Sequence, residues 1–158
     1  MKKNITSKNT SIEEITLRKY ERPINVGKRE VIKKICLSLG LLQEGDSRDV
    51  IVDILKVLVE ASSKREWITS KEVRNRAYDN RKSNNLKLIG LADSNVRRQL
   101  KRLKDLMIID TEKNHYAITE FMSLEELFEN KIEPFIIKPT ISRIKDYMKR
   151  SDKEFGLK

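Results

Sequence analysis

The chain has 158 residues, the length of one ordinary domain, and charged residues make up 37% of it against 38% hydrophobic residues. The formal net charge of +10 favours an anionic partner, with nucleic acid first and an acidic protein or a membrane surface second. A single cysteine excludes an internal disulfide, and the lack of any run near ~18 apolar residues, or of a signal-peptide core, favours a cytoplasmic protein with no membrane partner.

The first region, residues 1–27, is predicted to be an N-terminal extension that is partly flexible. Ser11 and Glu14 have the spacing of a capping box, which predicts a short helix. The alternation of Ile15 and Leu17 predicts a strand instead. The sequence leaves these two alternatives open.

Two apolar helices are predicted next. The first covers residues 28–39 and carries one apolar stripe, with Gly40 as its stop signal. The second starts at an N-cap, Asp46 or Ser47, and runs to residue 63. This second helix is apolar nearly all round, so we expect it to be buried on more than one side, by the first helix and by either its own domain or a second chain.

The middle of the chain predicts a strand and two helices, in this order: residues 67–69, 70–80 and 95–106. Thr69 and Glu72 form a capping box at the start of the first of these helices. Asp93 or Ser94 is the expected N-cap of the other. The long connection between them carries leucines, which we expect to pack against the core.

The last third predicts a hairpin followed by helix. Residues 107–119 are expected to form two short strands around a turn at residues 112–114. Two amphipathic segments, residues 123–132 and 138–155, are predicted to be helical. The predicted fold class is therefore α+β, mainly helical, with a domain at residues 28–119 and a helical segment at 120–158 that packs on it or dimerises.

An apolar pattern in the helix at residues 94–106 runs directly into the hairpin, at Val96, Leu100, Leu103, Leu106 and Ile109. The stretch "WITSKEV…SNVRRQLKRLKDLMIIDTEKNHYAIT" resembles the winged helix-turn-helix domains of archaeal and bacterial transcription regulators. The resemblance implies a helix that reads the DNA major groove and a β-hairpin wing beside it. Two features depart from the family pattern: the helix connection is longer, and no glycine precedes the first wing strand.

The helix at residues 94–106 gathers cations on the face opposite its apolar stripe, with Arg98 near the centre. Arginine can contact guanine and asparagine can contact adenine, which suits Asn95, Arg98 and Arg102 to base reading, while other cations would hold phosphates. The alternative interpretation is a solvated charged face. The predicted nucleic-acid-binding residues are Ser94, Asn95, Arg97, Arg98, Lys101, Arg102, Lys104, Lys71, Arg74 and Lys113. Further cations are expected on the preceding helix and the connection: Arg76, Arg81, Lys82 and Lys87.

No set of residues predicts catalysis. His115 is the only histidine and has no cysteine or second histidine near it in sequence, which makes a metal site improbable. "SLGLLQEGDS" lacks the lysine and spacing of a phosphate-binding loop. The sequence therefore predicts a protein that is not an enzyme and has no cofactor.

The function predicted from sequence is a DNA-binding transcription regulator that binds double-stranded DNA. The alternatives are a protein-interaction module in a nucleic-acid-processing assembly and an RNA-binding protein. A homodimer is also considered, through the helices at residues 28–63 and an apolar row in the last helix: Ile137, Ile141, Ile144 and Met148. The sequence leaves open whether that row packs on its own domain or on a second chain.

Overall fold

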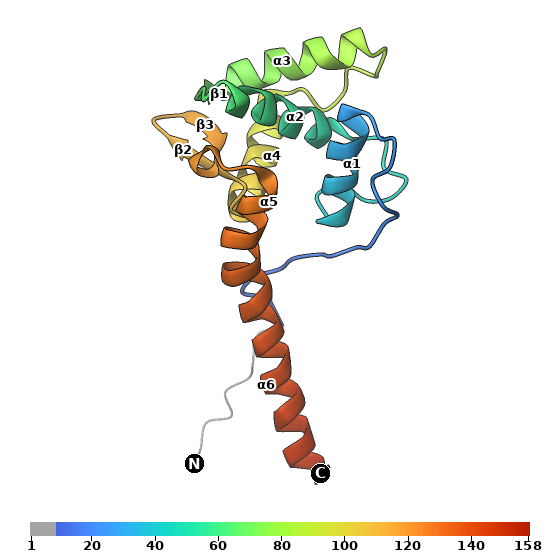
Figure 1. Cartoon of the computed structure of the whole chain (residues 1–158), viewed down its shortest axis with the longest axis vertical. Coiled ribbons are helices and arrows are strands. Elements are labelled where there is room, and N and C mark those ends of the chain that lie inside the picture. Colours follow the sequence, from blue (N-terminus) through green and yellow to red (C-terminus); the bar gives the residue numbers. More distant parts are fainter. Residues whose placement is uncertain (1–8) are drawn as a thin grey trace.

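A computed structural model describes residues 9–158 and shows a cluster of helices with a small sheet at one end of a long projecting helix (Figure 1). The α+β class with mainly helical content is confirmed. The predicted fraying of residues 1–8 lies outside the described part. Within residues 9–158, no helix has both the length and the apolar character needed to span a bilayer.

The elements follow each other in the predicted order of helices, strand, helices, hairpin and helix. The main helices are α1 (Lys28–Ser38), α2 (Val50–Ser63), α3 (Ser70–Ser83), α4 (Asp93–Asp105), α5 (Leu124–Leu127) and α6 (Lys138–Phe155). Two other helical segments are η1 (Thr119–Phe121) and η2 (Phe128–Ile137). The strands are β1 (Ile68–Thr69), β2 (Ile109–Glu112) and β3 (His115–Ile118).

The three strands form one antiparallel sheet in the order β1-β3-β2. Ile68 lies opposite Tyr116, and Ile109 lies opposite Ile118. The β2–β3 turn consists of Lys113 and Asn114, both with positive φ angles (48° and 63°), as in the two-residue turns that match strand twist.

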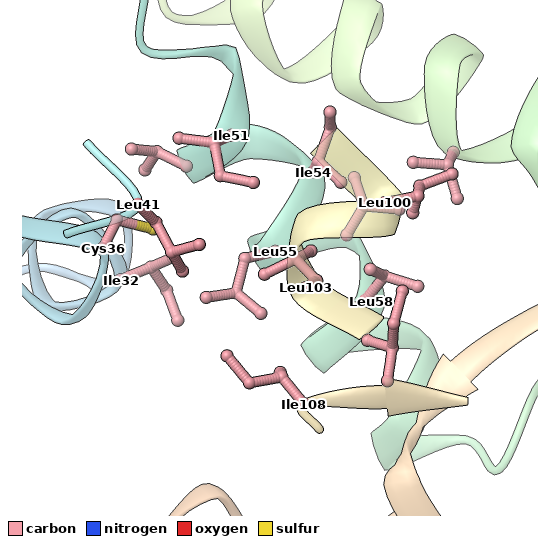
Figure 2. Packing of buried hydrophobic residues seen from close by; sticks show 14 of the residues in the cluster. Ile32, Cys36, Leu41, Ile51, Ile54, Leu55, Leu58, Leu100, Leu103 and Ile108 are labelled. Carbon is pink, nitrogen blue, oxygen red and sulfur yellow. The ribbon is translucent and has the colours of Figure 1, made fainter. Parts of the chain in front are cut away.

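Helix α2 is the centre of the core, as its apolar circumference predicted. Ile54, Leu55 and Leu58 are fully buried. Figure 2 shows α1 side chains on one side of α2 and the α4 residues Leu100 and Leu103 on the other. Since no apolar residue of α2 is exposed, this helix has no free apolar face for a second chain.

The N-terminal extension forms neither the helix nor the strand considered for residues 11–17, and it is held by contacts to the end of α1 instead. The Arg18 backbone N–H donates to Ser38 O at 2.8 Å, and its guanidinium donates to the carbonyls of Leu37 and Leu42 at 3.0 and 3.2 Å. Such long-range bonds leave no local periodicity in the sequence. Gly40 ends α1 as predicted, with φ +69°.

The predicted start of α2 and the predicted end of α3 were wrong. The residues found at these two boundaries, Asp49 and Arg81, belong to one buried ionic cluster. Helix α2 begins at Val50 with Asp49 as its N-cap, because Asp46 instead accepts the Arg48 N–H within the preceding turn. Helix α3 continues beyond residue 80 to Ser83, since Arg81 is buried in its last turn. The connection to α4 is consequently shorter than the sequence suggested.

The buried ionic cluster joins α1, α2 and α3. Arg81 Nη1 lies 2.7 Å from Asp53 Oδ2 and 2.9 Å from Asp49 Oδ1, and Arg29 binds both carboxylates from α1 at 2.9–3.2 Å. Burial disfavours the charged form of Asp49, but hydrogen bonds from Arg29 and Arg81 hold its pKa below the ordinary value. The cluster places two positive charges against two negative ones, which makes its burial tolerable.

The two C-terminal segments predicted as separate helices form one continuous helical rod from α5 through η2 to α6. The Ser123 hydroxyl accepts the Glu126 N–H, so Ser123 caps the start of the rod. Pro134 lies inside η2, where the backbone follows a wider π-helical winding because proline lacks an N–H. Leu127, Ile132 and Ile136 anchor the first half of the rod in the core.

Candidate nucleic-acid interface

Helix α4 is divided into a buried side and an exposed side. Val96, Leu100 and Leu103 are buried, in agreement with the predicted apolar stripe, and Gln99 is buried beside them. The exposed side carries what we call the α4 ridge, which consists of Ser94, Arg97, Arg98, Lys101 and Lys104. Helix contacts to α2 and α3 hold the buried side, so the ridge points away from the core.

On one side of the ridge, a groove of about 570 Å³ separates the first turns of α3 and α4. Its cationic side chains are Lys71, Arg74 and Arg97. Arg74 Nε donates to Leu91 O at 2.7 Å and lies 3.6 Å from Asp93 Oδ1. Arg74 therefore holds the connection in place, which leaves the positive charge of this groove mainly to the other two cations.

On the other side of the ridge, a groove of about 760 Å³ lies between α4 and the loop that joins α1 to α2. The predicted base-reading residues Asn95, Arg98 and Arg102 all line this groove. Arg48, from the loop, lines it as well. Sequence reasoning missed Arg48, because it sits in a turn whose position beside α4 depends on tertiary packing alone.

The three predicted base-reading residues already have hydrogen-bond partners in the protein. Asn95 Nδ2 donates to Gly90 O at 2.7 Å, and Arg98 Nη2 donates to Asn95 Oδ1 at 2.6 Å. Arg102 is half-buried and donates to Gln99 Oε1 at 2.7 Å and to Gly40 O at 3.3 Å. Asn95 and Arg102 therefore have a packing role, whereas the exposed Arg98 needs to break one surface bond to turn outward.

The remaining ridge cations are less constrained. Lys101 Nζ lies 3.1 Å from Asp105 Oδ2, but both side chains are well exposed, so this pair contributes little. Among residues 9–158, no carboxylate lies within 4.0 Å of the charged groups of Arg97, Lys104 or Lys71. These three cations add uncompensated positive charge to the site, and so does Arg98, whose guanidinium bonds only the neutral Asn95 amide.

The other cations predicted from the sequence lie outside the α4 ridge. Lys113 is exposed at the tip of the β2–β3 hairpin, next to Glu112. Arg76 is paired with Glu66 at 3.2 Å. Arg81, expected in a surface connection, is 1% exposed and belongs to the ionic cluster of the core. The sequence signal for that role was Asp53, an acid placed among the apolar residues that open α2.

The chain was compared with protein-family models, curated proteins and solved structures. No family model, no curated protein and no solved structure matches the chain.

Proposed function

We propose that this protein is a DNA-binding transcription regulator of the winged helix-turn-helix type, which places α4 in the major groove of a duplex. The observation that carries the proposal is the α4 ridge, whose cations lie between two grooves and are largely without ionic partners. Like charges four residues apart, such as Arg97 and Lys101, destabilise an isolated helix slightly. Bound phosphates would remove that repulsion.

The geometry suggests how the ridge residues divide the work. Arg97, Lys104 and Lys71 bind phosphates, because none of them is paired with a carboxylate. Arg97 and Lys71 line the groove toward α3, and Lys104 follows Arg97 by seven residues, on the same side of α4. Arg98 and Ser94, in the first half of the helix, face base edges. In this proposal α3, α4 and the β2–β3 hairpin correspond to the helix pair and the wing, and the protein acts as a cytoplasmic homodimer on two half-sites.

The test is binding to random-sequence duplex DNA, measured by fluorescence anisotropy from 50 to 300 mM salt. The variant Arg97→Gln with Lys104→Gln removes two proposed phosphate contacts. Each contact contributes about 0.9 to the slope of log affinity against log salt, so the slope should fall by about 2. The matched control, Lys149→Gln with Lys153→Gln, removes the same charge from α6 and should bind like the unaltered protein.

Equal losses in both variants would mean that net charge, not the ridge, governs binding, and would contradict the proposal. Failure of the unaltered protein to bind any duplex at 50 mM salt would also contradict it. In that case the ridge faces an acidic protein or structured RNA, and selection from a random DNA pool would yield no enriched site.

A further inference from the structure

Helix α6 is the least covered element of the molecule. It has 18 residues, none of them buried, and it projects away from the core (Figure 1). Large apolar side chains are exposed along it: Ile141 by 45%, Ile144 by 49%, Met148 by 62% and Phe155 by 79%. Most of the stability of a helix in a protein comes from the packing of its apolar side, and α6 has no such packing within the chain.

The apolar side chains of α6 follow a coiled-coil repeat. From Ile137 the positions advance by alternating steps of four and three residues through Ile141, Ile144, Met148, Ser151 and Phe155. This average period of about 3.5 residues keeps one seam facing a neighbouring helix in a left-handed supercoil. The charged residues of α6 lie off the seam, which indicates another helix as the partner.

We propose that α6 pairs with α6 of a second copy of this chain as a parallel two-stranded coiled coil. The seam and the large flanking residue Tyr147 can together bury roughly 500 Å² per chain, an estimate based on 150–250 Å² for each aromatic residue. The pair then reaches the ~1,000 Å² at which an interface becomes specific. Helix α2 is covered by its own chain, so α6 carries the contact without α2.

The residues that flank the seam favour the parallel orientation. In that orientation, the residue just before the first seam position of each repeat, Thr140 or Tyr147, faces the residue five positions further along the partner helix. Tyr147 then faces Asp152, and Thr140 faces Lys145, so no like charges meet. In the antiparallel orientation centred on the same seam, Lys138 faces Asp152 of the second copy, but Lys145 faces Lys145, and these two ammonium groups repel each other. The parallel orientation has no such repulsive pair.

The parallel orientation has a consequence for DNA binding, which rests on the proposed function. It places both winged-helix domains at the same end of the coiled coil, related by a two-fold axis. Two α4 ridges on one side of a dimer can contact half-sites about one helical turn apart, near 34 Å. An antiparallel pair would hold the two ridges at opposite ends of the coil.

The pairing is tested by sedimentation equilibrium of the full chain from 1 to 100 µM. The unaltered protein should be a dimer in the upper part of this range. Ile144→Glu puts a charge into the seam and should give a monomer with an intact core, as judged by its cooperative urea unfolding. Ser142→Glu adds the same charge outside the seam and should stay dimeric. A monomeric unaltered protein at 100 µM, or a dimeric Ile144→Glu variant, overturns the proposal.

The orientation is tested by Ser151→Cys, with Ser142→Cys as its control. In the parallel pair, the two copies of position 151 occupy one layer of the seam, close enough for a disulfide under mild oxidation. In the antiparallel pair, position 151 faces Ile141, and no disulfide forms. Cys36 is fully buried and does not interfere. Cross-linking no faster than in the control overturns the parallel arrangement.

The two proposals can fail separately. The Ile144→Glu monomer should still bind a short duplex with the salt slope of one α4 ridge, but should lose at least tenfold in affinity on a duplex long enough for two sites. If the unaltered protein dimerises and does not bind DNA, the proposed function is contradicted and the coiled-coil pairing is not.

Discussion

Gly40, just after the end of α1, lies against Thr16 of the N-terminal extension. Its φ of +69° lies in the left-handed region, and an added Cβ would lie 2.8 Å from Thr16 Oγ1 and closer still to the Thr16 Cβ. Gly40→Ala should therefore combine about 1 kcal/mol of backbone strain with about 1–3 kcal/mol of overpacking. Urea unfolding measures the sum.

Gly45→Ala is the matched control for this substitution. Gly45 has a similar φ of +76°, but an added Cβ would meet nothing within 4 Å. It should show the backbone strain alone, about 1 kcal/mol. Equal destabilisation by the two variants would mean that the extension does not pack against Gly40 as described.

The buried ionic cluster predicts a large effect from one side chain. Arg81→Met leaves Asp53 and Asp49 with Arg29 as their only cation, and losing one partner of a buried pair costs about 3–5 kcal/mol. Arg76→Met breaks an exposed pair with Glu66 and should cost less than about 1 kcal/mol. Thermal and urea unfolding of both variants give the comparison, and similar values would contradict the role of Arg81 in the core.

The same cluster links stability to pH. The pKa of Asp49 is lower in the folded protein than its ordinary value of 3.8, so folding is favoured by its ionisation. The resulting stabilisation is complete above the unfolded-state pKa and is lost as the pH falls toward the folded-state pKa. The stability difference between the unaltered protein and Asp49→Asn should therefore shrink between pH 6 and pH 3. A difference that stays constant over this range would show that the carboxylate charge is not involved.

At the scale of the helices, α3 and α4 begin differently although both border the same groove. Thr69 accepts the Glu72 N–H and caps α3, whereas Ala92 occupies the N-cap of α4 and offers no side-chain oxygen. Thr69→Ala should destabilise the protein by about 1 kcal/mol, and Ala92→Ser should stabilise it by about 0.5–1 kcal/mol. Urea unfolding tests both, and a destabilising Ala92→Ser would mean that the first turn of α4 is satisfied in another way.

The predicted helices and the hairpin depended on local signals, and these were the parts that the sequence resolved well. The N-caps Thr69 and Ser123, Gly40 as a helix stop and the apolar period of α4 each act within a few residues. The expected caps Asp93 and Ser94 were wrong by one or two positions, because both residues are in the first turn of α4 rather than before it.

The parts that could not be predicted are those fixed by distant residues. Residues 9–27 have no regular structure, since the bonds of Arg18 to the end of α1 replace a local pattern. The α2 start moved to Asp49, whose carboxylate is held by cations 20 and 32 residues away in sequence. In the candidate site, the helical period of α4 predicted which side is buried and which is exposed. The bond from Arg102 to Gly40 could not be predicted, because it joins residues 62 positions apart and has no local sequence signal.

At the scale of the whole molecule, the C-terminal rod is divided between a half that the core needs and a half that it does not. Leu127, Ile132 and Ile136 are each about 1% exposed, whereas α6 contributes no buried residue. A chain ending at Ile137 should keep the unfolding free energy of the full-length monomer within about 0.5 kcal/mol, as substitutions on open surface do. Its helical circular-dichroism signal should be smaller.

A chain ending at Ser123 is the matched comparison, because it also removes those three buried side chains. Each large buried aliphatic residue contributes about 2–5 kcal/mol, and a whole domain is stable by only about 5–15 kcal/mol. This shorter chain should therefore be unfolded or close to it in urea titrations at 25 °C. Loss of cooperative unfolding already in the chain ending at Ile137 would show that α6 supports the core of a single chain, and that its exposed seam is not reserved for a partner.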